Sequence, residues 1–87
     1  MSFFVYILFS RTTQRFYIGQ TGDIQKRIQS HNEGRSPSTR FGRPWTIEYI
    51  EVCATRAEAV RRERYLKSLK SAKALRSIIE ETQSQSG

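Results

Sequence analysis

The chain has 87 residues, enough for one domain with a single modest core. Its 15 Lys and Arg against 8 Asp and Glu give a formal net charge of +7, which favours a polyanionic partner, nucleic acid first and an anionic membrane surface second. The apolar runs are too short for a membrane span and Cys53 is the only cysteine, which excludes an internal disulfide and a multi-cysteine metal site and leads us to expect a soluble, cytoplasmic protein.

Two runs rich in aromatic and β-branched residues open the chain, at 3–9 and 15–21, and a polar stretch joins them. They predict a β-hairpin. Because side chains alternate along a strand, the hairpin would place the phenols of Tyr6 and Tyr17 on one face, and Gly19 would leave room beside them for a backbone or a ligand. Taken alone, the hairpin favours the simpler interpretation that both tyrosines are half-buried core residues.

Asp23 is a typical capping residue and predicts a helix over 23–32. One stripe of this helix carries Ile24, Ile28 and His31, with Arg27 on its shoulder. We expect the isoleucines to pack inward and Arg27 and His31 to lie along the helix edge.

Residues 32–44 are rich in Gly, Ser, Pro and Arg and predict a loop of about a dozen residues, a length at which loops are often functional. The loop carries Arg35, Arg40 and Arg43 against one acid, Glu33. A solubilising surface loop and a loop that clasps phosphates explain this composition equally well.

The segment Trp45–Val52 is rich in strand formers and predicts the third strand. Trp45, Ile47 and Tyr49 would share one face of it, and Ile50 and Val52 the other. The expected fold is α+β, a small three-stranded antiparallel sheet flanked by helices. We expect one domain over residues 1–82 and a disordered tail over residues 83–87.

Thr55 and Glu58 have the spacing of a capping box that begins the next helix. The inward stripe of that helix comprises Ala59, Val60, Glu63, Leu66 and Lys70. Glu63 lies near the middle of the stripe, where a carboxylate is costly unless it is paired, hydrogen-bonded or bound to a metal. Two interpretations remain open for it, a functional carboxylate and a structural salt bridge to an arginine.

Cations dominate residues 56–76, and Arg62, Lys67 and Lys70 are among them. A solvated helix face explains most of these charges, but their number also suits contacts with a phosphate backbone. A last amphipathic helix is expected over 71–79. The sequence has no repeat, no glycine-rich phosphate loop and no His or Cys cluster at metal-ligand spacing.

Five short motifs follow one another in the chain: Val5-Tyr6-Ile7, Tyr17-Ile18-Gly19, Arg27, His31-Asn32 and Glu63. Over about residues 3–80 this order resembles the GIY-YIG nuclease superfamily, in particular small stand-alone members similar to the catalytic N-terminal domain of the excinuclease catalytic subunit (UvrC-type). The first motif departs from the family because Phe4 replaces its glycine. Gln20 stands where some relatives carry a lysine, which puts one auxiliary phosphate contact in question.

The resemblance implies a metal-dependent endonuclease that hydrolyses phosphodiester bonds in DNA, in repair or recombination. Tyr6 and Tyr17 would line the site, with Tyr6 the better candidate for activating the attacking water. Arg27 would stabilise charge on the scissile phosphate, His31 would hydrogen-bond a tyrosine or the phosphate, and Glu63 would hold one Mg²⁺ or Mn²⁺ ion. The expected nucleic-acid contacts are Gly19, Arg35, Arg40, Arg43, Arg62, Lys67 and Lys70.

A tyrosine with an ordinary pKa near 10 is a weak base, so the metal, Arg27 or His31 must assist, and activity should rise with pH. Two other functions fit the same features: a non-catalytic DNA- or RNA-binding module, and a structural protein of a nucleoprotein assembly. Glu63 favours the enzyme because binding alone does not require a carboxylate there. The sequence leaves open the form of the nucleic acid, the oligomeric state and whether a protein partner supplies specificity.

Overall fold

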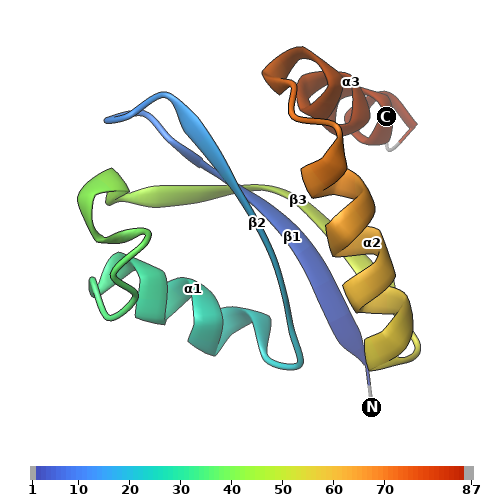
Figure 1. The fold of residues 1–87 in the computed structure, drawn as a ribbon, viewed down its shortest axis with the longest axis horizontal. Coiled ribbons are helices and arrows are strands. Elements are labelled where there is room, and N and C mark those ends of the chain that lie inside the picture. Colours follow the sequence, from blue (N-terminus) through green and yellow to red (C-terminus); the bar gives the residue numbers. More distant parts are fainter. Residues whose placement is uncertain (1, 86–87) are drawn as a thin grey trace.

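The computed structural model describes residues 2–85, and the side chains of residues 2–81. Three antiparallel strands form one sheet in the order β2-β1-β3: β1 (Phe3–Ser10), β2 (Arg15–Thr21) and β3 (Trp45–Cys53). Helix α1 (Ile24–Asn32) lies on one face of the sheet, and α2 (Arg56–Ser68) and α3 (Ala72–Gln85) pack on the other (Figure 1). The predicted α+β fold is therefore confirmed.

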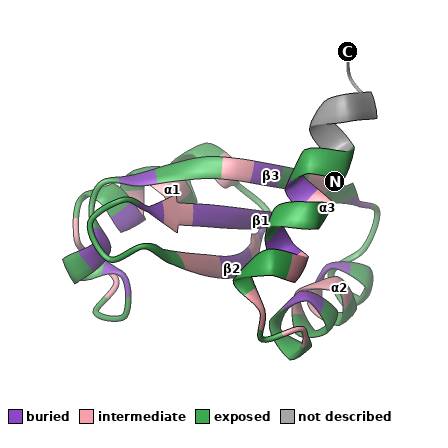
Figure 2. Ribbon diagram, turned by 90° about the horizontal axis from the view of Figure 1, so that it is seen from above, coloured by how far each residue is buried: buried purple, intermediate pink, exposed green. Residues whose placement is uncertain are grey.

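The central strand β1 is buried on both faces, as the burial colouring shows (Figure 2). Val5 and Ile7 join the core under α2 and α3, whereas Tyr6 and Leu8 join a second cluster under α1. A strand covered on both faces needs apolar side chains at successive positions, which explains the unbroken apolar run in the sequence. Tyr6 thus lies at the centre of the molecule.

The register of the hairpin pairs Tyr6 with Gly19 and Leu8 with Tyr17. Directly paired residues point to the same face of a sheet, so Tyr6 and Tyr17 share the face that α1 covers. The predicted common face of the two tyrosines is confirmed.

A β-bulge in β3 changes the predicted faces of that strand. Ile7 pairs with Tyr49 and Leu8 pairs with Ile47, so Glu48 is one extra residue. Beyond it the alternation is inverted, and Tyr49 packs in the core under α2 and α3 while Trp45 packs under α1. The prediction that Trp45, Ile47 and Tyr49 share a face is therefore wrong for Tyr49.

Side-chain caps fix where the helices begin. Asp23 accepts a hydrogen bond from the N–H of Lys26, and Thr55 accepts one from the N–H of Glu58, as the sequence predicts. The Glu58 carboxylate accepts from the N–H of Ala54 rather than from Thr55, so the capping box is closed one residue earlier than its usual form. Ser71 caps α3 by accepting from the N–H of Ala74.

Two predicted ends differ from the structure. Helix α2 ends at Ser68, and Lys70, expected on its inward stripe, follows it with a positive φ of 48°. Helix α3 continues to Gln85, three residues into the tail expected to be disordered, since glutamine and serine are compatible with a helix and no glycine or proline interrupts them. The rest of that tail, residues 86 and 87, lies outside the described residues. Within residues 2–85 no helix is long and apolar enough to cross a membrane.

Candidate active site

A buried chain of hydrogen bonds joins β1, α1 and the loop before β3. The hydroxyl of Tyr6 lies 3.1 Å from Nε2 of His31, and Nδ1 of the same imidazole lies 2.8 Å from Oγ1 of Thr39. The exposed fractions of Tyr6, His31 and Thr39 are 1%, 2% and 0%. When the Thr39 hydroxyl donates to the carbonyl of Ser36, Nδ1–H of His31 donates to Thr39 and Nε2 accepts the proton of Tyr6.

The protonation states of this pair follow from its surroundings. Burial, with a smaller contribution from the positive charge of Arg27, lowers the pKa of His31, so its imidazole is neutral at pH 7. Burial, followed by the neighbouring Tyr17, raises the pKa of Tyr6 to about 12, against the opposing effect of Arg27. In the free site Tyr6 is therefore a protonated phenol beside a neutral proton acceptor.

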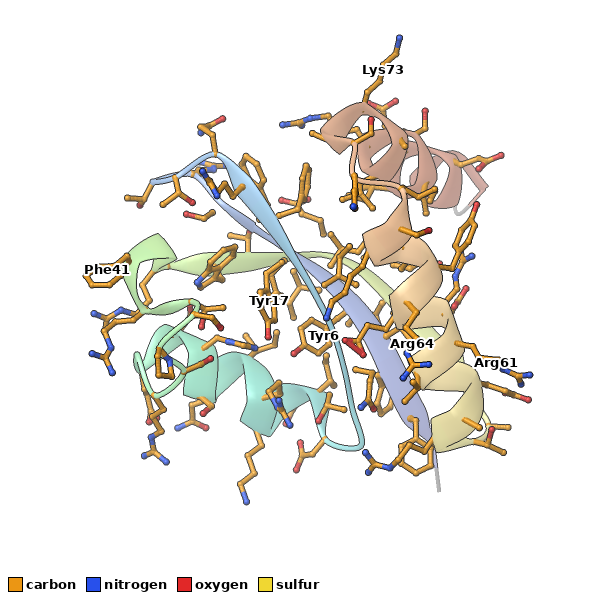
Figure 3. The ribbon with its side chains drawn as sticks, in the orientation of Figure 1. Tyr6, Tyr17, Phe41, Arg61, Arg64 and Lys73 are labelled. Atoms are coloured by element: carbon orange, nitrogen blue, oxygen red, sulfur yellow. The ribbon has the colours of Figure 1, made fainter. Side chains whose placement is uncertain are left out.

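Tyr17 forms the wall of the site next to Tyr6 and His31. Its ring centroid lies 6.5 Å from that of Tyr6 and 5.0 Å from that of His31, and Trp45 packs against its ring with a centroid distance of 6.2 Å. Figure 3 shows both tyrosines between the sheet and α1. Tyr17 is only half-buried, so it forms the boundary between the buried pair and solvent.

Gly19 makes room for Tyr6 itself. A Cβ at position 19 would fall 2.6 Å from Cζ of Tyr6, a distance that real side chains do not adopt. Gly19 is buried, and the space beside it holds the Tyr6 ring rather than a ligand. The absent side chain of Gly19 therefore leaves space for the Tyr6 ring, while a nucleic-acid contact at Gly19 stays a prediction.

Two charged groups on different helices act on Tyr6. Arg27 on α1 is exposed and lowers the pKa of Tyr6, whereas Glu63 on α2 raises it, both effects being smaller than burial. The Glu63 side chain is 19% exposed, and its Oε2 lies 2.7 Å from Nζ of Lys67. The carboxylate on the inward stripe is thus paired, but with a lysine one turn later instead of the arginine considered from the sequence.

Glu63, the metal ligand expected from the resemblance, is not part of a larger cluster of ligands in the described residues. Among residues 2–85 no group of three or more His, Cys, Asp or Glu could hold an ion. One carboxylate is a sufficient protein ligand for Mg²⁺ when water and phosphate oxygens complete the coordination shell. Such an ion would compete with Lys67 for the carboxylate of Glu63. This single carboxylate fits a metal ion that is held weakly by the protein and is also bound by the phosphate of the substrate.

Residues 2–76 match the sequence model of the GIY-YIG catalytic domain. The chain belongs to the GIY-YIG nuclease family. A UPF0213 protein of Staphylococcus aureus is 35% identical over 80 residues, which cover 91% of this chain and 96% of the relative. A UPF0213 protein of Bacillus licheniformis is 36% identical over 69 residues, which cover 78% and 70% of the two chains.

A solved structure supports the same GIY-YIG fold. The solution NMR structure of a UPF0213 protein from Bacillus halodurans superimposes with a TM-score of 0.59 and 28% identity, covering 92% of this chain and 84% of the other. GIY-YIG proteins are nucleases that act on DNA, so the family membership makes the chain a member of a nuclease family. Among the residues that the sequence aligned with the family's motifs, Tyr6, Tyr17 and His31 lie in contact with one another, and the charges of Arg27 and Glu63 act on the phenol of Tyr6.

The predicted nucleic-acid contacts divide into two groups in this GIY-YIG domain. Arg35, Arg40 and Arg43 are exposed on the loop before β3, and Lys67 and Lys70 are exposed at the end of α2. Arg62 is instead partly buried, with its Nε 3.0 Å from Oε2 of Glu51 on β3. Since Glu51 also accepts a hydrogen bond from Tyr49, Arg62 belongs to a structural network, and its contact with nucleic acid stays a prediction.

Two residues that build the site, Thr39 and Trp45, could not be recognised as site residues from the sequence. Thr39 orients His31, and the indole N–H of Trp45 donates to the carbonyl of Thr39 at 2.8 Å. Asn32, given only a supporting role from the sequence, accepts from the N–H of Trp45 at 2.7 Å and donates to its carbonyl. A threonine among loop residues carries no periodic or motif signal, so only the folded structure identifies Thr39.

Proposed function

We propose that this chain is a divalent-metal-dependent endonuclease that cleaves phosphodiester bonds in DNA. The observation that supports it most is the 3.1 Å contact between Tyr6 and a neutral, buried His31, with the charges of Arg27 and Glu63 acting on the same phenol. A tyrosine with a purely structural role in the core could be buried among neutral side chains, so the charges around Tyr6 favour a functional role. A biological setting in repair or recombination rests on the family likeness alone.

Each residue has a role that its position supports. The Tyr6 oxygen would take the proton of the attacking water as the phenol proton passes to Nε2 of His31, and Arg27 would stabilise the negative charge that develops on the phosphate. Glu63 would hold a Mg²⁺ or Mn²⁺ ion, which supplies further positive charge for the phosphate and the leaving oxygen. Because His31 must be neutral to accept a proton, the rate should rise with pH as His31 loses its own proton.

The test is cleavage of end-labelled single-stranded, duplex and branched DNA with Mg²⁺, Mn²⁺ or a chelator. Glu63→Gln keeps the side-chain shape and removes the charge that holds the ion. Glu58→Gln is the matched control, because it changes the same residue type on the same helix and its amide oxygen can still accept from Ala54. We expect the wild type and Glu58→Gln to cut only with metal, and Glu63→Gln not to cut.

One observation favours a second candidate, a non-catalytic DNA-binding module. The carboxylate of Glu63 already has a cationic partner in Lys67, a structural role that a protein that only binds could also use. If the wild type and Glu63→Gln bind every substrate equally and cut none, the binding module is the correct function and Glu63 is a structural ion-pair residue.

A further inference from the structure

Phe41 is the most unusual side chain outside the site. It is 82% exposed and lies on the short 3₁₀ turn η1 (Arg40–Gly42), from which it projects away from the molecule (Figure 3). A single exposed apolar side chain is common on protein surfaces and needs no function. Phe41 differs from such residues because hydrogen bonds hold the turn that carries it and because two arginines lie on the same loop.

The turn is fixed on both sides of Phe41. The carbonyl of Thr39 accepts the indole N–H of Trp45, and the carbonyl of Arg43 accepts the hydroxyl of Thr12 at 3.3 Å. Trp45 also packs directly on Gly42, where a Cβ would fall 2.8 Å from its Cε2. Phe41 is therefore held outward by a braced backbone, which reduces the entropy it would lose on binding.

Two arginines lie close to Phe41 in the sequence. Arg40 and Arg43 are exposed, and the Nε of each donates to a backbone carbonyl, that of Gly34 at 3.2 Å and that of Arg40 at 2.7 Å. These bonds orient both guanidinium groups and use one of the five N–H donors of each. An exposed aromatic ring on the same loop as oriented arginines is a combination that binds single-stranded nucleic acid, with the ring stacking on a base and the cations contacting phosphates.

The same turn is coupled to the active site. Thr39, two residues before Phe41, hydrogen-bonds His31, and Trp45 packs on Tyr17. A strand held at Phe41 would therefore lie on the element that also orients the proton acceptor. In a duplex the faces of the internal bases are covered by their neighbours, so an outward ring stacks most readily on a base that is unpaired and unstacked.

We propose that Phe41 stacks on an unpaired base of the bound strand while Arg40 and Arg43 hold the adjacent phosphates. The loop over residues 33–44 then selects strands with an unpaired base beside the cleaved bond. The selection of a cleaved bond rests on the proposed nuclease function, whereas the stacking contact does not.

The experiment measures binding and 2-aminopurine fluorescence with a short DNA strand that carries one 2-aminopurine, and with the same strand in a duplex. Phe41→Ala removes the ring and Phe41→Tyr keeps it. Tyr65→Ala is the control, because Tyr65 is an exposed aromatic on α2. We expect the wild type, Phe41→Tyr and Tyr65→Ala to quench the fluorescence of the single strand. Phe41→Ala should lose the quenching and bind the single strand about 5- to 150-fold more weakly, with unchanged duplex affinity.

Unchanged quenching in Phe41→Ala, or an equal loss of affinity for single strand and duplex, would overturn the stacking contact. These outcomes are separate from a failure of the nuclease function. Quenching that depends on Phe41 in a protein that cuts no DNA contradicts the nuclease and supports the contact. Normal cleavage of strands with unpaired bases by Phe41→Ala, without quenching in the wild type, supports the nuclease and overturns the contact.

Discussion

The hydroxyl of Tyr6 and Nε2 of His31 meet at 3.1 Å although the two residues are 25 positions apart in the sequence. Tyr6 comes from the central strand and His31 from the last turn of α1, which the packing of Ile24 and Ile28 holds against the sheet. The two side chains meet only because α1 packs on the sheet. The pair is therefore a product of tertiary packing, and substitutions that disturb the packing should disturb the chemistry.

Thr39 is expected to act through His31. Thr39→Val keeps the shape of the side chain but leaves Nδ1 of His31 without this partner, which should reduce the cleavage rate by about 10- to 100-fold and stability by about 1–3 kcal/mol. Thr39→Ser retains the hydroxyl and should restore most of the rate. Single-turnover cleavage together with urea unfolding measures both effects. Equal rates for the valine and serine variants would show that Thr39 only fills space.

The close approach of Gly19 to Tyr6 predicts that Gly19→Ala is costly. The added methyl group collides with the Tyr6 ring, so we expect a loss of about 1–3 kcal/mol of stability and a displaced Tyr6 hydroxyl. Gly22→Ala is the matched control on the same stretch, since its Cβ would lie at an ordinary 3.9 Å from Phe3. Urea unfolding of both variants decides the point, and equal stabilities would contradict the packing described at Gly19.

The lowered pKa of His31 leads us to expect that the stability of the protein depends on pH. Its pKa in the folded protein is lower than the ordinary 6.5, chiefly through burial, so the unfolded chain binds the proton more readily. Stability should therefore be at its full value above pH 6.5 and decrease as the pH falls from 6.5 toward the folded pKa. His31 is the only histidine, so His31→Gln should remove this decrease in urea unfolding at a series of pH values. If the stability of His31→Gln still decreases in the same way at low pH, the decrease comes from the protonation of carboxylates and not from His31.

Arg62 and Arg43 are expected to differ in what they support. Arg62→Gln removes the ion pair with Glu51 and should lower stability by at most about 1 kcal/mol, because both side chains are partly exposed, with little effect on DNA affinity. Arg43→Gln should weaken DNA binding and reduce its salt dependence with little effect on folding. DNA titrations at several salt concentrations separate the two. A larger loss of affinity in Arg62→Gln would contradict the structural role assigned to Arg62.

Local patterns in the sequence predict those parts of the fold that depend on local physics. Asp23 and Thr55 cap the helices as expected, and the period of two in the first hairpin places Tyr6 and Tyr17 on one face. The faces of β3 could not be predicted, because the bulge at Glu48 exists only in the pairing with β1.

The same distinction holds for the site. Motif order predicts Tyr6 and the four residues whose rings or charges act on it, since each motif lies on a strand or helix. The role of Thr39 and the burial of Arg62 depend on which loop and which helix face meet in three dimensions. The charges of Arg62 and Arg43 are identical in the sequence, and only packing separates a structural arginine from an exposed one.

The central claim, that the Tyr6 hydroxyl takes part in DNA cleavage, is tested most directly by Tyr6→Phe in a single-turnover cleavage assay with Mg²⁺. This change removes one oxygen and keeps the ring that packs on Gly19. We predict that the variant folds and binds DNA like the wild type but cuts at least about 100-fold more slowly. Cleavage at the wild-type rate by the folded variant would contradict the role of Tyr6 and, with it, the site proposed here.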